Sequence, residues 1–153
     1  MAFPEPKLLR GNDPSDVSFA SETYSLTSEQ IHTLQSRSAS AKSTATGAYI
    51  DGANVENAAY PVGTCAERVA FGKAITEGQR GFRAIGVATD ISPPASPCGM
   101  CRQFIREFCE LDMPIFMFDK NGDFMVARLG ELLPLSFGPE ALPPREKLAE
   151  IER

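Results

Sequence analysis

The sequence predicts an α/β fold in which helices pack on a central sheet, and two observations predict it. Segments with the apolar spacing of an amphipathic helix alternate along the chain with short runs rich in aliphatic and aromatic residues. The 153 residues are 42% hydrophobic and 23% charged, which is typical of one globular domain whose core needs no disulfide staples. We therefore expect one sandwich of helices and strands, without internal repeats.

Start and stop signals define the expected helices. Thr27 and Gln30 fit a capping box, and Gly78 is a natural stop for the second helix. Ser96 is expected to cap the third helix, with Pro97 at its first position. The inward face of that third helix is expected to carry Met100, Cys101, Phe104, Ile105 and Phe108. The helical segments are 28–42, 64–77 and 97–108, with a last helical turn that begins at Glu131.

The strands are expected between these helices. Asn121-Gly122 predicts a hairpin turn between the last two of them. The expected strands are 48–50, 82–89, 114–118 and 124–128. Residues 1–25 are predicted to be a flexible extension, although 17–24 would form a strand if another segment paired with it. The domain would then span 26–142, and 143–153 would be a tail.

The charge balance excludes several classes of partner. Fifteen basic and twenty acidic residues give a formal charge of −5, so no basic stripe is available for nucleic acid. The longest apolar stretch, 113–118, is far shorter than the roughly 20 residues that a membrane span needs. The first residues contain no apolar signal-peptide core. We expect a cytoplasmic protein with no nucleic acid and no membrane among its partners.

Three of the four cysteines form a pattern that is typical of a zinc site. Cys65, Cys98 and Cys101 lie at the predicted starts of two helices, where free N–H groups favour the thiolate. Three protein ligands leave the fourth tetrahedral position open, as in catalytic zinc sites. Cys109 is excluded as a fourth ligand because it lies roughly 12 Å further along the same helix. His32, the only histidine, is expected on the surface of a weak helix without a catalytic role.

Two charged residues follow Cys65 closely. Glu67 can lean toward the metal without binding it and is the candidate proton carrier. Arg68 is a candidate donor to the sulfurs, where it would offset the negative charge of three thiolates. A redox-active dithiol of Cys98 and Cys101 is the alternative interpretation, and it predicts no bound zinc.

Four motifs resemble the homotetrameric cytidine deaminases over about residues 47–142, in that family's order. The segments are NVENAAY at 54–60, CAER at 65–68, SPCGMCRQ at 96–103, and LLP with FGP at 132–139. The resemblance implies a three-layer α-β-α sandwich with a mixed sheet, a homotetramer, and pyrimidine salvage.

The resemblance implies hydrolytic deamination of cytidine and 2′-deoxycytidine to uridine and 2′-deoxyuridine. Zinc-bound hydroxide would attack C4 of the base, while Glu67 carries protons. Asn54 and Glu56 would bind the ribose, and the backbone N–H of Ala66 would face the base. Phe137 resembles the aromatic residue that reaches the site of a neighbouring subunit. The ligands implied are Cys65, Cys98 and Cys101.

The chain departs from that family before residue 47, where an interior strand and its phenylalanine are expected to be missing. Three explanations are open: residues 17–24 replace the strand, its two neighbours pair directly, or the chain is a splice variant that folds poorly. Two functional alternatives are open as well. One is a catalytically impaired zinc-binding paralogue that acts in oligomers, and the other is a deaminase of another aminopyrimidine nucleoside.

Overall fold

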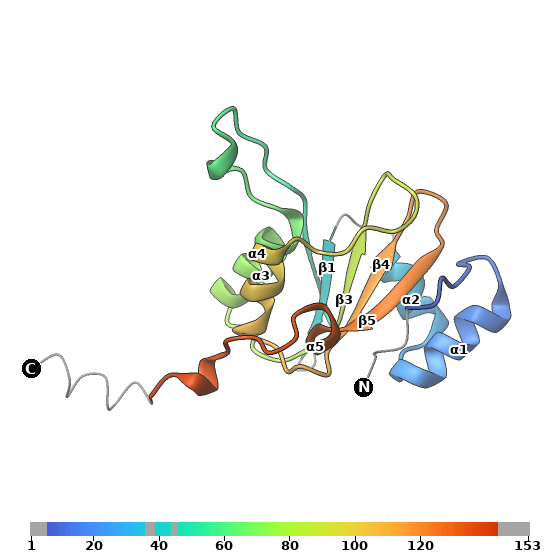
Figure 1. Ribbon diagram of the computed structural model, residues 1–153. Helices are drawn as coiled ribbons and strands as arrows, with labels where there is room; N and C mark the ends of the chain where they lie inside the picture. Colours follow the sequence, from blue (N-terminus) through green and yellow to red (C-terminus); the bar gives the residue numbers. More distant parts are fainter. Residues whose placement is uncertain (1–5, 36–38, 44–45, 144–153) are drawn as a thin grey trace, which may run out of the picture.

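In the computed structural model, which describes residues 6–35, 39–43 and 46–143, five strands form one sheet between two layers of helices (Figure 1). The strand order is β2-β1-β3-β4-β5. β3 and β4 run parallel, and the other neighbours are antiparallel. The strands are β1 (Ala39–Ser43), β2 (Tyr49–Gly52), β3 (Phe82–Ala88), β4 (Pro114–Phe118) and β5 (Phe124–Arg128). The structure confirms the α/β sandwich with a mixed sheet.

The helices cover both faces of the sheet. α3 (Ala66–Thr76) and α4 (Gly99–Arg106) lie on one face, and α1 (Pro14–Tyr24) and α2 (Ser28–Gln35) lie on the other (Figure 1). The short elements are α5 (Leu129–Leu132) and the 3-10 turns η1 (Tyr60–Val62) and η2 (Pro139–Ala141). No helix of the described residues is both long enough and apolar enough to cross a membrane.

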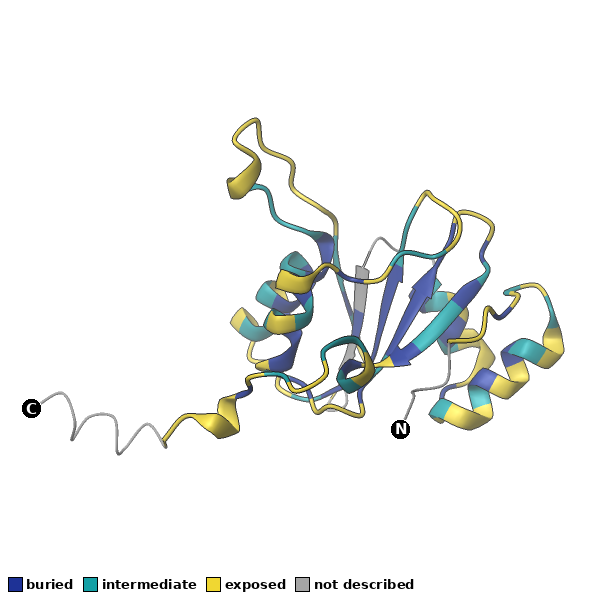
Figure 2. Cartoon of the chain, viewed as in Figure 1, coloured by how far each residue is buried: buried dark blue, intermediate teal, exposed yellow. Residues whose placement is uncertain are grey.

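The two-residue period of the strands divides the buried side chains into two cores, one on each face of the sheet. Ile115 and Met117 of β4 pack in the core beneath α3 and α4. Phe116 and Phe118 of the same strand pack in the opposite core with residues of α1 and α2. The middle of the sheet is accordingly buried on both faces (Figure 2).

Two local predictions are confirmed by their hydrogen bonds. Thr27 N–H donates to Oε1 of Gln30 at 3.0 Å, and Gln30 N–H donates to Oγ1 of Thr27 at 3.2 Å, which is the capping box. In the turn between β4 and β5, Gly122 has a φ of 86°, a conformation that glycine adopts without strain. Oδ1 of Asp119 accepts the N–H groups of Asn121 and Asp123 and closes this turn.

Residues 14–24 form a helix where the sequence analysis expected a flexible extension, and the strand considered for 17–24 is wrong. Asp13 caps α1 by accepting the N–H of Ser15 at 2.9 Å, and Pro14 occupies the first turn, where its missing N–H costs nothing. Further upstream, Leu9 exchanges two backbone hydrogen bonds of 2.7 Å with Phe124 on the edge strand β5. The boundaries at 25/26 and 142/143 stay predictions, and residues 144–153 lie outside the described residues.

The expected gap before residue 47 is wrong, because the strand β1 occupies the interior of the sheet. The helix expected over 28–42 ends at Gln35, and Ala39–Ser43 pairs with β2 on one side and β3 on the other. Neither residues 17–24 nor direct pairing of β2 with β3 fills this place. Ala41 of β1 is fully buried, so the strand belongs to the core. Residues 36–38 and 44–45 are outside the described residues.

The start of the third helix also differs from the prediction. Cys98, not Ser96, is the N-cap of α4, and Gly99 is its first residue. The hydroxyl of Ser96 instead accepts a hydrogen bond from Arg102. Met100 was expected to point inward but is 64% exposed, since the buried face of α4 is formed by Cys101, Ile105 and Arg106. Cys101 and Ile105 are buried as predicted.

The packing of α1 generates a stability prediction. Ala20 lies on the buried face of α1 and is fully buried, whereas Ser18 on the same helix is exposed. We expect Ala20→Asp to lower the free energy of unfolding by about 3 kcal/mol, because it buries an unpaired charge. Ser18→Asn is the control on the exposed face of the helix, where it adds no charge beside Glu22, and it should change the free energy of unfolding by less than about 0.5 kcal/mol. Urea unfolding measures both, and equal values would show that α1 is not part of the core.

Candidate functional site

A pocket of about 400 Å³ opens where β3 ends and where α3 and α4 begin. Ligands of α/β proteins commonly bind at the carboxyl ends of strands, because loops and helix N-termini converge there. The pocket is lined by Asn54, Cys65, Ala66, Glu67, Val87, Ala88, Thr89, Asp90, Ala95 and Ser96. It therefore contains one cysteine of the predicted cluster and the predicted proton carrier.

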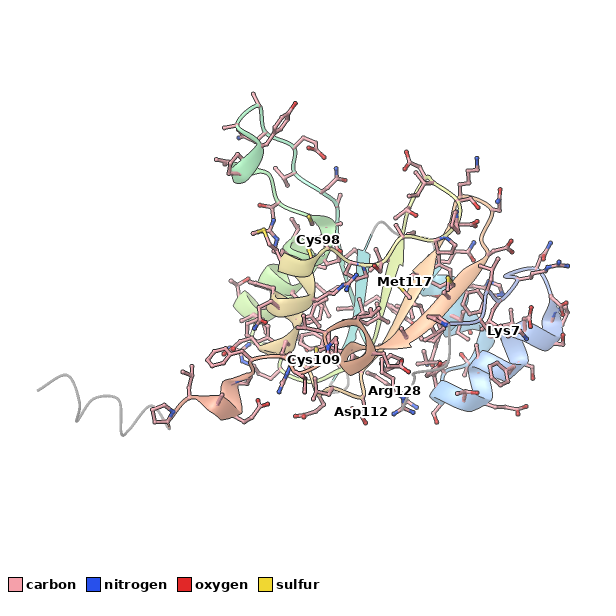
Figure 3. The ribbon with its side chains drawn as sticks, in the orientation of Figure 1. Lys7, Cys98, Cys109, Asp112, Met117 and Arg128 are labelled. Atoms are coloured by element: carbon pink, nitrogen blue, oxygen red, sulfur yellow. The ribbon has the colours of Figure 1, made fainter. Side chains whose placement is uncertain are left out.

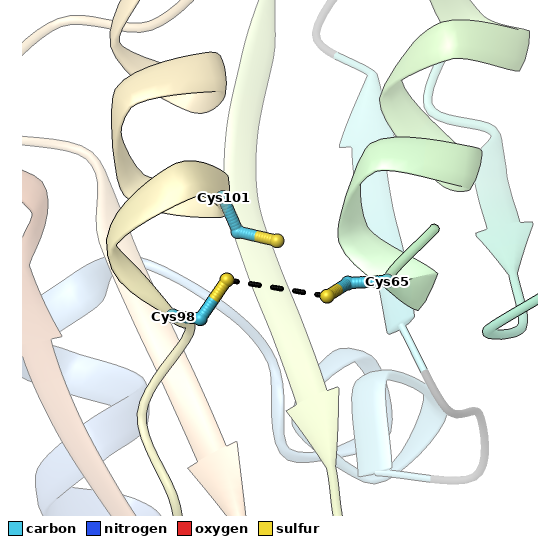
Figure 4. A group of neighbouring side chains, drawn as sticks. All are labelled: Cys65, Cys98 and Cys101. Carbon is cyan, nitrogen blue, oxygen red and sulfur yellow. Dashed lines mark hydrogen bonds between the residues drawn. The ribbon is translucent and has the colours of Figure 1, made fainter. Parts of the chain in front are cut away.

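Three cysteine sulfurs meet at the first turns of the two helices (Figure 4). Cys65 is the N-cap of α3, Cys98 is the N-cap of α4, and Cys101 lies in the first turn of α4. The three sulfur atoms lie within 4.8 Å of one another, and those of Cys65 and Cys98 are 3.9 Å apart. Tetrahedral zinc with Zn–S bonds of about 2.3 Å places its sulfurs about 3.8 Å apart. The cluster therefore fits a zinc ion with three sulfur ligands.

The electrostatics of the cluster favour a cation among the sulfurs. Partial burial raises the pKa of Cys98, but hydrogen bonds from the Cys101 N–H and from the neighbouring thiols outweigh it, and the pKa is lowered. For Cys101 burial dominates, and the charge of Glu67 adds to it, so its pKa is raised. Three thiolates this close repel one another, and a divalent cation is what allows all three to lose their protons.

The guanidinium of Arg68 lies near the sulfurs. Hydrogen bonding to Cys65 raises the pKa of the Arg68 guanidinium, and Cys101 contributes in the same direction. Nη2 of Arg68 also donates to the carbonyl of Gly63 at 3.3 Å. The positive charge is thus held against two of the three sulfurs.

Glu67 lies beside the cluster without belonging to it. It is the second residue of α3, it is 7% exposed, and it lines the pocket. Its charge contributes to the raised pKa of Cys101, which places the carboxylate close to that sulfur. The metal-binding group found among the described residues contains the three cysteines and not Glu67.

Gly52 positions the first turn of α3 against the sheet. A Cβ atom at this position would lie 2.4 Å from both the carbonyl oxygen of Ala66 and the nitrogen of Ala70. Only glycine permits this approach of the β2 backbone to α3. The strand expected over 48–50 stops short of Gly52, and the sequence pattern gives no sign of this contact.

The predicted substrate-binding residues are brought together only in part. Asn54 and Ala66 line the pocket, and Nδ2 of Asn54 donates to Oε1 of Glu56 at 2.6 Å. Both Asn54 and Glu56 are exposed, on the segment between β2 and α3 that projects from the body (Figure 1). Phe137 is not among the residues that line the pocket, and its side chain is 60% exposed.

Arg102 is a residue of this site that the sequence analysis missed. Its guanidinium donates to the carbonyls of Pro97 and Leu132, both at 2.7 Å, and to the hydroxyl of Ser96 at 2.6 Å. These bonds tie the loop before Cys98 to α4 and to the end of α5. The signal in the sequence is its place directly after Cys101, within the motif at 96–103.

Cys109 is not part of the cluster. It lies beyond the far end of α4 from Cys98 (Figure 3), and its pKa is raised to about 12 by burial. This confirms its exclusion as a metal ligand.

Comparison with known proteins identifies the family. The model of the cytidine and deoxycytidylate deaminase zinc-binding region matches residues 21–117. The chain belongs to this deaminase family. The zinc-binding region of the family model includes all three clustered sulfurs, which agrees with zinc as the ion that they bind.

Relatives and solved structures of the family agree with this assignment. The chain is 45% identical over 96 residues to the cytidine deaminase of Sporosarcina psychrophila, covering 63% of this chain and 71% of the relative. It is 44% identical over 94 residues to that of Halalkalibacterium halodurans, covering 61% and 71%. The crystal structure of cytidine deaminase from Burkholderia pseudomallei matches with a TM-score of 0.62 at 37% identity, over 65% of this chain and 79% of that one. The fold of the deaminase family is therefore established for this chain.

Zinc binding should depend on the clustered sulfurs and not on Cys109. We expect Cys101→Ser to lower the zinc content from about one ion per chain to well below half, because a two-sulfur site holds zinc weakly. Cys109→Ser is the matched control on the same stretch of chain and should keep its zinc. Metal analysis after dialysis measures both, and full zinc retention in Cys101→Ser would contradict the site.

Proposed function

We propose that this chain catalyses the hydrolytic deamination of cytidine and 2′-deoxycytidine, which gives uridine and 2′-deoxyuridine with ammonia. The observation that carries the proposal is the buried carboxylate of Glu67 in a pocket beside a three-sulfur site. A zinc ion held by Cys65, Cys98 and Cys101 would supply Lewis-acid activation of a water molecule at neutral pH.

Glu67 carries the protons of the reaction. The carboxylate takes one proton from the attacking water and delivers it to N3 of the base as oxygen bonds to C4. It then takes the second proton of that oxygen and gives it to the amino group, so that ammonia leaves and the carbonyl of the uracil ring forms. Burial of Glu67 keeps competing water away from these transfers.

The other residues bind and orient the nucleoside. Asn54 and Glu56, already joined by a hydrogen bond, bind the ribose hydroxyls. The N–H of Ala66 belongs to the first turn of α3, has no partner within the helix, and faces the base. Arg68 withdraws charge from the sulfurs, which preserves the Lewis acidity of the metal.

Phe137 acts in the site of a second subunit within a homotetramer. Its large exposure, together with that of Tyr60 (90%) and Val62 (65%), is the observation that supports an assembled state. We place the enzyme in pyrimidine salvage and in the cytoplasm, since a cluster of three reduced thiols suits a reducing compartment.

Glu67→Gln tests the proton carrier. We expect it to lower kcat for cytidine by about 10³-fold or more, because an amide cannot accept the proton, while zinc content stays at the parent value. Glu77→Gln, at the exposed end of the same helix, is the control and should keep the parent rate. The loss of cytidine absorbance measures both.

Activity surviving in Glu67→Gln would contradict the mechanism. A parent enzyme that binds zinc yet leaves cytidine unchanged would instead support the impaired paralogue. The observation that favours this paralogue is that the pocket lining, over the described part of the chain, contains no aromatic residue. Turnover of another aminopyrimidine nucleoside in place of cytidine would support the remaining alternative, a deaminase with a different nucleoside substrate.

The charge of the pocket predicts a preference for nucleosides over nucleotides. Its charged lining residues are Glu67 and Asp90, and the lining contains no lysine or arginine among the residues that the structure describes, so a phosphate here would lie beside carboxylates. We expect cytidine to exceed cytidine 5′-monophosphate in kcat/KM, and Asp90→Lys to narrow that ratio by about tenfold. Asp112→Lys, outside this pocket, is the control and should leave the ratio unchanged.

A further inference from the structure

The segment from Leu133 to Leu142 exposes apolar side chains although its backbone is held firmly. Leu135 is fully exposed, Phe137 is 60% exposed and Leu142 is 50% exposed. Leu135 also has a φ of 53°, a left-handed conformation that a leucine adopts at an energetic cost. A strained backbone that holds exposed apolar side chains in one conformation indicates that this segment binds another protein surface.

Two side chains of α4 hold the middle of this segment. Nε2 of Gln103 donates to the carbonyl of Phe137 at 2.9 Å. Nε of Arg106 donates to Oγ of Ser136 at 3.1 Å, and its Nη2 forms an ion pair with Glu140. We call these two residues the α4 clamp.

The clamp is rigid because Arg106 is buried. It is 5% exposed, and a buried guanidinium that loses its partners is strongly unfavourable. The chain crosses directly over it at Gly138, where a Cβ atom would lie 2.2 Å from Nη2 of Arg106. Any other position of residues 136–140 would therefore leave a buried charge unpaired.

We propose that Gln103 and Arg106 are positioning residues that hold Phe137 at the angle at which its ring enters the pocket of a second copy of this chain. This inference rests on the proposed role of Phe137 in the neighbouring site. Cys98 caps α4, Cys101 lies in its first turn and Arg106 is its last residue, so one helix positions two metal ligands of its own copy and the ring delivered to the next copy.

A double-mutant cycle tests the clamp, with KM, kcat and zinc content as readouts. Phe137→Ala and Arg106→Gln should each raise KM for cytidine about five- to tenfold with little change in kcat and full zinc. The double variant should match Phe137→Ala alone, because the clamp acts through that ring. Arg106→Lys should recover part of the loss, since it keeps the ion pair with Glu140 but not the bond to Ser136.

Two further variants separate positioning from folding. Arg80→Gln removes an exposed arginine that also donates to backbone carbonyls, and it should leave KM unchanged. Gln103→Ala changes an exposed side chain and should raise KM by about threefold even if Arg106→Gln does not fold. Additive effects in the double variant, or a fall in kcat and zinc at unchanged KM, would overturn the proposal.

Mixed oligomers show whether the ring of Phe137 enters the pocket of its own copy or that of a neighbouring copy. When Arg106→Gln chains are assembled with Glu67→Gln chains, every turnover occurs at an Arg106→Gln site, and part of that activity should regain the parent KM. No recovery would overturn delivery between copies. An inactive parent enzyme would contradict the proposed deaminase function. An active parent enzyme whose KM for cytidine is unchanged by Phe137→Ala would overturn the clamp inference alone.

Discussion

The functional site depends on two helix N-termini that lie side by side, so that three sulfur atoms can bind one metal ion. Cys65 caps α3, Cys98 caps α4, and their sulfurs are 3.9 Å apart. Free N–H groups at both helix starts and the guanidinium of Arg68 offset part of the negative charge that gathers there. The remainder requires a divalent cation, and this requirement joins the fold to its chemistry.

The sheet brings the two helices into position through a chain of close backbone contacts. β1 pairs with β2 and β3, so β2 is attached to the sheet only through β1. β2 in turn meets the first turn of α3 at Gly52, where no side chain fits between them. The short strand β1, with Ala41 buried at its centre, thus fixes the position of β2 and, through it, of Cys65 and Glu67 on α3.

Local signals in the sequence sufficed for the elements that short-range chemistry controls. The capping box at Thr27 and the Asn121-Gly122 turn appear as expected, and β4 and β5 have the predicted bounds. The cysteine cluster was predictable because cysteines at two helix starts, where free N–H groups favour the thiolate, are typical of a metal site. What could not be read from the sequence was set by distant partners. β1 has no apolar alternation of its own, and it is a strand because two neighbours supply hydrogen bonds on both sides.

The remaining differences have the same origin. α1 has a weak apolar face, and its place becomes evident only when Val17 and Ala20 meet the aromatic residues of β4 and β5. α4 begins only after Ser96 and Pro97, both of which accept hydrogen bonds from Arg102, a partner that the local cap signal does not reveal. The α4 clamp joins residues thirty or more positions apart, and no local sequence pattern indicates contacts between residues so far apart.

X-ray absorption at the zinc edge of the purified protein tests the central claim most directly, because it counts the atoms bound to the metal. The account predicts three sulfur neighbours at about 2.3 Å and one lighter atom at about 2.0 Å. Four sulfur neighbours would mean a closed, structural site, and two or fewer would mean that the three cysteines do not share one ion. Either result would contradict the account.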